Sequence, residues 1–515
     1  MLFGVPGGGG NLDLIDAARD ARLPFVLTST ETGAAIAAIA QAEITGQPGA
    51  CLTTLGPGAA SVVNGVACAH LDRVPLFVFT DSDAAAALGA FTHQQLDQRT
   101  LFAGVTRWSG RLSSDHADEV LEYAWASTAG PPPGPVHIEC SADFETTPYP
   151  STVLTVPQSR PAPSPDFTDL QLRLATARKP LVIAGLGARR PDVAQAVRHL
   201  CERRQVPAMV TYKAKGVVPD DHPRFAGVFT HGALERAVVA DSDLIIGIGL
   251  DPVELLPRPW DYEAPIVYVG VWPVLAAHVP FASLHVTDDL AAGVSQIEAG
   301  LWWSDWDFEA LHKLVDDGRR CVDLRTDEGR LTPAQVVRTA ASQLSPQARV
   351  TVDAGAHMFP ATLLWPVREP NGLLISNGLS TMGFALPAAI GAALLDRSRP
   401  VVALIGDGGL LMCAGELQTL AREHLPVIVV VFSDQSLSLI DIKQRQRGLP
   451  SDGVSLGATD WAGVARGFGI AAFVAADQAG LEQAVEQAAA TAGPALIDAR
   501  VDPSTYSATL KTLRG

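Results

Sequence analysis

Two aspartates follow two apolar stretches near the end of the chain. Asp407 lies in Gly406-Asp407-Gly408 directly after VVALI, and Asp434 follows PVIVVVF, 27 positions further on. That separation accommodates one helix and one strand, so both carboxylates are expected at the carboxyl ends of parallel strands, where open α/β sheets bind ligands. Two carboxylates and a backbone carbonyl suit Mg²⁺ or Ca²⁺ beside a diphosphate, which the glycines would let approach the backbone. A plain turn is the structural alternative.

Three other polar motifs lie in the first part of the chain. Glu31 stands in TETGA between an apolar strand and an apolar helix, Gly56-Pro57-Gly58 opens a helix, and THQQ places His93 and Gln94 after a strand. Each motif alone has an ordinary explanation: a surface glutamate, a structural turn and a solvated loop. Only their combination indicates a site.

The elements that must position these residues alternate between strands and helices along the whole chain. Short β-branched runs flanked by Gly or Pro, with ~10–15-residue helices between them, predict parallel, doubly wound sheets. A proline-rich stretch at 148–165 and a helical stretch rich in Trp and charge near 302–332 separate three segments. We therefore predict an α/β fold with three doubly wound parallel-sheet domains, at residues 1–148, 166–302 and 332–515.

The N-terminus and the composition add further expectations. Leu2 to Val5 resembles the end of a strand without its preceding helix, so we expect the chain to begin inside its first unit, through a late start codon or trimming. A hydrophobic fraction of 47% over 515 residues excludes a disordered chain. A net charge of −17 argues against nucleic acid or an anionic membrane as a partner. Six cysteines without a CxxC pair predict buried, reduced thiols, and with no signal peptide or apolar span we expect a cytoplasmic protein.

Taken together, the motifs resemble the thiamine-diphosphate-dependent enzyme family over nearly the whole chain. The resemblance rests on GDG with its second carboxylate, TETGA, GPGA, GVPGG and SNGLSTMGFALPAAIGAAL. Within that family, TMGF at 381–384 and DAGAH at 353–357 are most similar to the acetolactate synthase-like group. The resemblance implies pyrimidine-binding, central and diphosphate-binding domains in a homodimer or homotetramer. It also implies thiamine diphosphate and Mg²⁺ as cofactors and a 2-oxoacid as the small-molecule substrate.

The resemblance implies roles for residues around the cofactor's pyrimidine ring. Glu31 would share a proton with the ring, and burial is expected to raise its pKa. Met382 would support the bent shape of the cofactor, and the Ser380 carbonyl would accept a hydrogen bond from the aminopyrimidine. Gln94 would lie near the reacting carbonyl, and His93 is a candidate for proton transfer if the enzyme is a decarboxylase or lyase.

The resemblance likewise implies a diphosphate and metal site. The residues that would line the diphosphate are Gly355, His357, Gly408 and Gly409. The Mg²⁺ ligands would be Asp407, Asp434 and the backbone carbonyl of Ser436.

Three positions depart from the pattern of the acetolactate synthase-like group. Asp434 stands where the second metal ligand is usually Asn, and Lys443 aligns with a Trp that shapes acceptor choice. Asp251 aligns with an Arg that binds the acceptor carboxylate and touches FAD. These changes put acetolactate formation and FAD binding in doubt. A lone GxG at 185–187 is weak evidence for a nucleotide site.

The leading interpretation is an enzyme that decarboxylates a 2-oxoacid and ligates the product to an acceptor. A simple non-oxidative 2-oxoacid decarboxylase or a carbon–carbon lyase is the alternative. A catalytically dead paralogue with a structural or regulatory role is a third possibility, against which the retained Glu31, Asp407 and Met382 argue.

Overall fold

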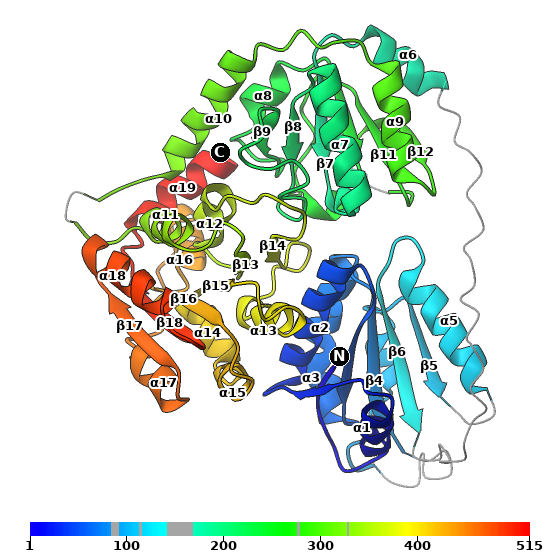
Figure 1. The fold of residues 1–515 in the computed structure, drawn as a ribbon, viewed down its shortest axis with the longest axis vertical. Coiled ribbons are helices and arrows are strands. Elements are labelled where there is room, and N and C mark those ends of the chain that lie inside the picture. The colour runs from blue at the N-terminus through cyan, green and yellow to red at the C-terminus, as the bar shows by residue number, and fades with distance from the viewer. Residues whose placement is uncertain (84–91, 113–115, 142–167, 275–278, 327–328) are drawn as a thin grey trace. The chain divides into compact units, whose positions relative to one another are not determined.

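Three parallel six-stranded sheets form the framework of the protein (Figure 1). The structure, a computed structural model, describes residues 1–83, 92–112, 116–141, 168–274, 279–326 and 329–515. Each sheet lies within one of the three segments expected from the sequence, and helices flank it. This arrangement confirms the predicted α/β class. The proline-rich stretch at 148–165 lies outside the described residues.

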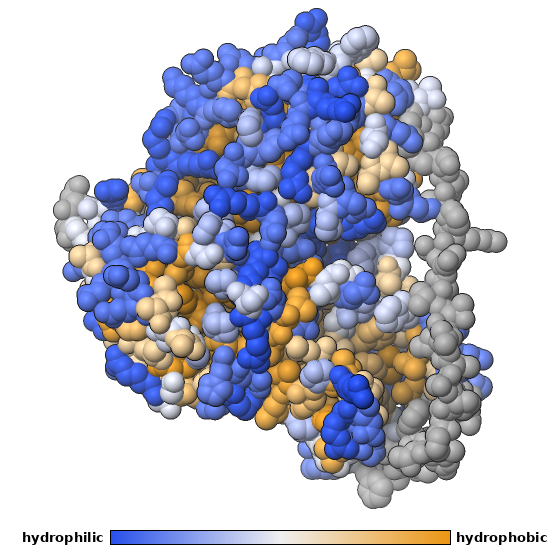
Figure 2. Space-filling view, in the orientation of Figure 1, coloured by the Kyte–Doolittle hydropathy of each residue, from blue (hydrophilic) through white to orange (hydrophobic). Residues whose placement is uncertain are grey.

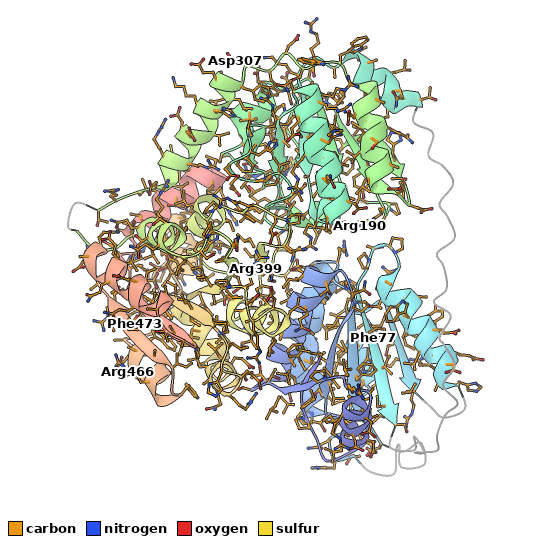
Figure 3. The ribbon with its side chains drawn as sticks, in the orientation of Figure 1. Phe77, Arg190, Asp307, Arg399, Arg466 and Phe473 are labelled. Atoms are coloured by element: carbon orange, nitrogen blue, oxygen red, sulfur yellow. The ribbon has the colours of Figure 1, made fainter. Side chains whose placement is uncertain are left out.

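The first sheet carries the polar motifs of the N-terminal segment. Its strand order is β2-β1-β3-β4-β6-β5, with β1 Leu2–Val5, β2 Phe25–Leu27, β3 Gly49–Thr53, β4 Leu76–Ser82, β5 Trp108–Leu112 and β6 Pro135–Ser141. The helices are α1 Asn11–Asp20, α2 Glu31–Thr45, α3 Pro57–Leu71, α4 Gln98–Phe102 and α5 Ala117–Ala129. Phe77 of β4, labelled in Figure 3, stacks on Phe79 and also contacts Trp125 of α5.

The second sheet forms the central domain, with strand order β12-β11-β10-β7-β8-β9. The strands are β7 Pro180–Ala184, β8 Ala208–Val210, β9 Phe225–Val228, β10 Leu244–Ile248, β11 Ile266–Gly270 and β12 Phe281–Val286. The helices are α6 Thr168–Thr176, α7 Pro191–Arg204, α8 Arg236–Ala240, α9 Leu290–Gly300 and α10 Phe308–Val322, with short turns η2 Leu186–Ala188 and η3 Pro252–Glu254. Helices α7 and α9 pack side by side, and the visible outer surface of this domain is largely hydrophilic (Figures 1 and 2).

The third sheet follows the order β14-β13-β15-β16-β18-β17. Its strands are β13 Arg349–Val352, β14 Leu373–Ile375, β15 Val401–Gly406, β16 Val427–Ser433, β17 Ala471–Ala475 and β18 Ala495–Arg500. The helices are α11 Pro333–Gln343, α12 Met358–Leu364, α13 Ala385–Leu395, α14 Asp407–Cys413, α15 Glu416–Arg422, α16 Ser438–Gln446, α17 Trp461–Gly467, α18 Gln478–Ala489 and α19 Ser504–Arg514. The runs VVALI and PVIVVVF become the central strands β15 and β16, because strands covered on both faces are apolar throughout.

The chain forms two compact units that do not coincide with the three sheets. Unit 1 comprises Met1–Arg160, Gly378–Ser398 and Leu411–Val427, and unit 2 comprises Pro161–Asn377, Arg399–Leu410 and Ile428–Gly515. Unit 1 thus contains two helices from the C-terminal part of the chain, α13 and α15. Helix α13 packs against α2; α13 is apolar throughout, and the middle of α2 is largely apolar and buried.

Two expectations from composition can be compared with the structure. None of the helices in the described ranges combines the length and apolar character that crossing a bilayer requires. All six cysteines are free, and five of them are buried. Cys321 is exposed, so the expectation of buried thiols is wrong at this position, which lies on the outward face of the amphipathic helix α10.

Candidate active site

Asp407 and Asp434 lie at the carboxyl ends of the neighbouring strands β15 and β16, as predicted. The Gln435 N–H donates to Asp407 Oδ2 at 2.6 Å, and the Gly408 N–H donates to Oδ1 at 2.8 Å. Asp434 accepts from the Ser436 N–H at 3.0 Å and from Ser438 Oγ at 2.7 Å. The turn that holds Asp434 and Ser436 is therefore tied directly to the carboxylate of Asp407.

The electrostatics of this pair fit a divalent cation. Burial raises the pKa of Asp434 to about 6, and the negative charge of Asp407 adds to that increase. Burial also raises the pKa of Asp407, although hydrogen bonds from backbone N–H groups oppose the shift. Two carboxylates that resist ionisation together are stabilised when a cation lies between them. Among the described residues no group of three or more His, Cys, Asp or Glu gathers, so the remaining ligands would be backbone carbonyls or water.

Glycines and an imidazole shape the neighbouring turn after β13. His357 is 4% exposed and stacks on Phe432 of β16, with ring centroids 5.0 Å apart. Burial lowers its pKa to about 4, a hydrogen bond to the Leu404 carbonyl opposes the shift, and its buried Nε2 has no partner. A Cβ at Gly355 would come within 2.9 Å of the imidazole, and one at Gly409 within 3.0 Å of Asp353. The orphaned Nε2 and these glycines fit a diphosphate.

The pyrimidine-side motifs come together within unit 1. Glu31 is the first residue of α2 and is half-buried. A Cβ on Gly58 would lie 3.3 Å from the Glu31 carboxylate, and one on Gly56 would collide with the Gln94 carbonyl. Gly56 also has a φ of +57°, a conformation that glycine adopts without strain. Three motifs far apart in the sequence are therefore neighbours, as the combination suggested.

The other predicted residues of the pyrimidine side are also in unit 1. His93 is exposed on the loop beside Gln94. Ser380 is exposed with a φ of +55°, and Met382 is half-buried. Their segment is fastened to α3, since the Gly378 N–H donates to Asp72 at 2.7 Å and Thr381 Oγ1 bonds Asn64 at 3.2 Å. The metal and diphosphate residues all belong to unit 2.

Asp251, which aligns with the Arg that binds the acceptor carboxylate, does not face an open site. It is 3% exposed and caps η3, where its side chain accepts from the Val253 N–H. The indole of Trp272 also donates to it, at 3.3 Å. Lys443, which aligns with the Trp that shapes acceptor choice, is exposed on α16.

A buried glutamate fills the crevice beside the GxG turn of the central domain. Glu254 accepts hydrogen bonds from the Leu186 N–H at 2.9 Å, the Asp251 N–H at 3.2 Å and Thr211 Oγ1. A Cβ at Gly185 would lie 2.6 Å from the Glu254 carboxylate, and one at Gly187 would lie 3.0 Å from Gly249. The backbone group that could bind a nucleotide phosphate is thus occupied by a carboxylate. The turn therefore has a structural role, and it gives no support for a flavin or nucleotide site.

Glu254 should give the central domain a measurable pH dependence. Burial raises its pKa from 4.5 to about 7, so between these values the folded protein keeps a proton that the unfolded chain releases. Its contribution to stability is therefore lost as pH rises through this window. Glu254→Gln keeps the shape and hydrogen bonds, so its Tm relative to wild type should increase from pH 4.5 to pH 7. Thermal denaturation measures both Tm values, and a Tm difference that does not change with pH would refute this account.

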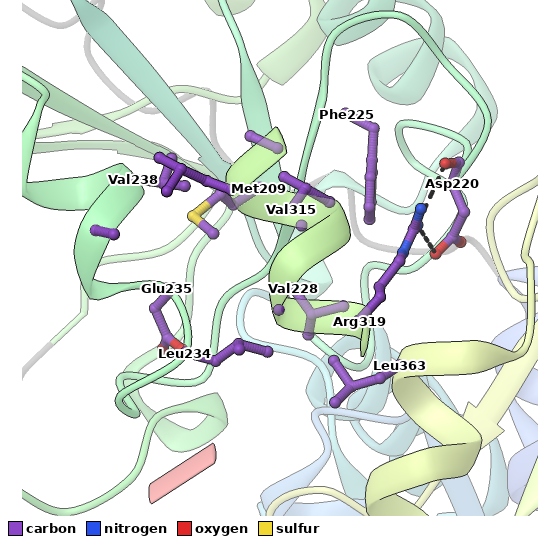
Figure 4. A pocket seen from close by; sticks show the side chains of 15 residues that line it. Met209, Asp220, Phe225, Val228, Leu234, Glu235, Val238, Val315, Arg319 and Leu363 are labelled. Carbon is purple, nitrogen blue, oxygen red and sulfur yellow. Dashed lines mark hydrogen bonds and ion pairs between the residues drawn. The ribbon is translucent and has the colours of Figure 1, made fainter. Parts of the chain in front are cut away.

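Two hollows in unit 2 are separate from the predicted site. One is a cavity of about 60 Å³ with mostly apolar walls, including Met209, Val228 and Leu363, and an Arg319–Asp220 ion pair at its rim (Figure 4). The other is an open groove of about 670 Å³ whose lining includes three arginines and three carboxylates. Neither contains any of the predicted site residues.

Two buried charged residues, Glu416 and Lys213, were not predicted from the sequence. Glu416 is fully buried in α15 and bonds the segment before Glu31. Lys213 is 2% exposed, and its ammonium donates to the Ile375 carbonyl at the end of β14, at 3.0 Å. Their partners lie 386 and 162 positions away, so local patterns carry no signal for them.

Replacing Asp434 by asparagine should have a mild effect. Asn keeps an oxygen ligand and removes the repulsion by Asp407, so the Kd for Mg²⁺ with thiamine diphosphate should change by less than about tenfold, or ~1.4 kcal/mol. Calorimetric titration measures this. Asp441→Asn is the control, since that buried carboxylate pairs with Arg445 and Ser451 instead. Loss of metal binding in Asp434→Asn alone would show that the second charge is required.

Comparisons with known proteins match all three segments to one family. The N-terminal TPP-binding, central and C-terminal TPP-binding domains of thiamine pyrophosphate enzymes match residues 1–101, 168–297 and 353–499. The catabolic acetolactate synthase of Raoultella terrigena is 28% identical over 98% of this chain and 92% of its own length. The acetolactate synthase of Bacillus subtilis is 27% identical, and a probable acetolactate synthase large subunit of Methanocaldococcus jannaschii is 28% identical, each over 98% of this chain and 90% of its own length. The chain therefore belongs to the thiamine pyrophosphate-dependent enzymes and is acetolactate synthase-like.

Proposed function

We propose that the protein uses thiamine diphosphate and Mg²⁺ to decarboxylate a 2-oxoacid and to join the product to an acceptor. The observation that carries this proposal is the Asp407–Asp434 pair at adjacent strand ends, tied together through the Gln435 N–H. Full-length similarity to acetolactate synthases supports the same reaction class. When bound, thiamine diphosphate supplies an electron sink for cleavage of the bond beside the carbonyl.

The residues of this chain would divide the work between binding and proton transfer. Asp407, Asp434 and the Ser436 carbonyl would hold the metal, while Gly355 and Gly408 would let the diphosphate approach the backbone. Glu31 would hold a proton on its carboxyl group opposite the pyrimidine nitrogen. Gln94 has an amide that can donate to the substrate carbonyl. His93, exposed beside it, remains a candidate proton donor.

The proposal is tested by incubating the protein with Mg²⁺, thiamine diphosphate and a panel of 2-oxoacids. Release of CO₂ together with a longer carbon chain, followed by mass spectrometry, would support carboligation. Release of CO₂ with an aldehyde would indicate the simple decarboxylase. If calorimetry shows that the cofactor does not bind, the protein is a paralogue without this activity.

Pyruvate alone should be a poor source of acetolactate. Condensing two pyruvates requires a cation beside the acceptor carboxylate, and an arginine fork serves this best. The aligned residue here is Asp251, buried as a cap, and Lys443 is exposed on its helix. We therefore expect an aldehyde or uncharged ketone as acceptor, or simple protonation. A steady-state assay with pyruvate as sole substrate compares acetolactate with acetaldehyde, and efficient acetolactate formation would refute the expectation.

We also propose a homodimer or homotetramer in the cytoplasm. Leu411 and Met412, which directly follow the diphosphate loop, are 48% and 59% exposed in the single chain, as expected of side chains that a second copy covers. The six free cysteines suit a reducing compartment. Light scattering after size-exclusion chromatography measures the oligomeric state.

A further inference from the structure

The carboxylate of Glu416 is completely buried in unit 1 and is surrounded by donors. Its Oε1 accepts from the Thr30 N–H at 3.0 Å and from Thr30 Oγ1 at 3.1 Å. The Ser29 N–H is shared between the two carboxylate oxygens at 3.1 and 3.2 Å, and Thr419 Oγ1 donates to Oε2 at 2.8 Å. Burial raises the pKa of this carboxyl group, while these hydrogen bonds oppose the shift.

The donors stand directly before Glu31. Thr30 Oγ1 also accepts from the Gly33 N–H at 3.0 Å and so caps α2. A Cβ on Gly33 would lie 2.8 Å from Glu416 Cδ, so the first turn of the helix rests on the carboxylate. Ser29 Oγ donates to the Gly415 carbonyl at 2.6 Å, which fastens the same segment a second time. The entry into α2, and with it the backbone of Glu31, is therefore fixed from α15.

We propose that Glu416 is a positioning residue for Glu31. This inference rests on the proposed function, in which Glu31 shares a proton with the cofactor. Proton sharing requires a carboxyl group at a defined place, and helix starts leave backbone N–H groups that need acceptors. The side-chain oxygens of Glu416 accept from the backbone N–H groups of both Ser29 and Thr30, so the length and placement of this side chain set the position of that segment. Glu416 therefore fixes the position of Glu31 without contacting the cofactor itself.

Geometry and charge can be separated with two substitutions. Glu416→Gln removes the charge but keeps an oxygen for Ser29 and Thr30, and its amide can donate to Thr419 Oγ1. Glu416→Asp keeps the charge but is one methylene too short to reach Thr30. Glu43→Gln is the matched control. Glu43 is a buried carboxylate near the C-terminal end of α2, whereas Glu31 is the first residue of that helix.

The first measurement uses the protein without cofactor, so it does not depend on the reaction. Amide hydrogen exchange of the peptide spanning 27–34, followed by mass spectrometry, should accelerate by about tenfold or more in Glu416→Asp. It should change little in Glu416→Gln and in Glu43→Gln. Unchanged exchange in Glu416→Asp would overturn the proposal.

The second measurement follows exchange of the C2 proton of bound thiamine diphosphate by NMR. Glu416→Asp should slow it by about 10-fold to 100-fold, the usual cost of misplacing a reacting group. Its cofactor Kd should stay within about threefold of wild type, and Glu416→Gln should exchange nearly normally. Slow exchange in Glu416→Gln together with normal exchange in Glu416→Asp would mean that charge rather than position matters and would overturn the proposal.

Two further comparisons keep the result decisive. If wild type binds no cofactor, the proposed function fails, and the amide exchange experiment still decides the role of Glu416. If Glu416→Asp does not fold, Thr30→Val removes one donor and the helix cap, and Thr30→Ser restores both. The proposal then requires slow C2 exchange in the valine variant and rescue in the serine variant.

Discussion

Asp407→Ala should lose thiamine diphosphate almost completely. The substitution removes one of two carboxylates expected to hold the metal, which is the main counter-charge to the diphosphate. It also removes the acceptor for the Gln435 N–H, so the turn that carries Asp434 and Ser436 loses its tie. Removing one partner of a buried charged pair costs about 2–5 kcal/mol, which raises Kd by roughly 30-fold or more.

Calorimetric titration with Mg²⁺ present tests this prediction. The cofactor should also stop protecting the variant against thermal unfolding, whereas wild type should gain ~2.7 kcal/mol at a ligand concentration of 100 Kd. Asp498→Asn is the control, since Asp498 is 1% exposed in the nearby strand β18 and is not an expected ligand. Normal cofactor affinity in Asp407→Ala would show that the metal assignment is wrong.

Glu31→Gln should bind the cofactor but lose most of its ability to activate it. Gln has nearly the same shape, but it cannot share a proton with the pyrimidine nitrogen. A positioned acid–base group contributes ~10²–10⁴-fold, so exchange of the C2 proton should slow by that factor. Exchange into deuterated water, followed by NMR at matched cofactor occupancy, measures the loss.

Glu43→Gln serves again as the control, because it removes a carboxyl group from the same helix without reaching the turn at Gly58. Exchange as fast as in wild type in the Glu31→Gln variant would remove Glu31 from the mechanism. A variant that cannot bind the cofactor would instead assign Glu31 a binding role.

The strands and the carboxylate pair were predictable because their signals are local. Parallel strands buried on both faces require uninterrupted apolar runs, and residues directly after them reach the same edge of the sheet. Asp407 and Asp434 therefore lie where their spacing indicated. The meeting of Glu31, Gly58 and Gln94 depends on how three strand ends converge, so single motifs could suggest it but not establish it.

The side chains that were predicted wrongly or not at all fall into two groups. Some have partners that are distant in the sequence, and others lie in a local pattern that was not recognised. The sequence Asp251-Pro-Val-Glu254 is a capping-box pattern, which explains why Asp251 turns inward instead of facing a substrate. Glu416 has no comparable pattern, because its donors in Ser29 and Thr30 are nearly four hundred positions away. The helical stretch that contains α10 was predicted, but whether Cys321 lies on its outer face depends on what the helix packs against.

Unit 1 is assembled from distant parts of the sequence, which has a consequence during synthesis on the ribosome. Helix α2 leaves the ribosome early, yet α13, which covers its apolar surface, is encoded some 340 positions later. At ~5–20 residues per second, the nascent chain must carry an uncovered apolar helix for tens of seconds. Helix α15, whose Glu416 secures the start of α2, emerges later still. We expect the N-terminal segment to depend on chaperones in that interval and to aggregate when it is expressed without the C-terminal segment.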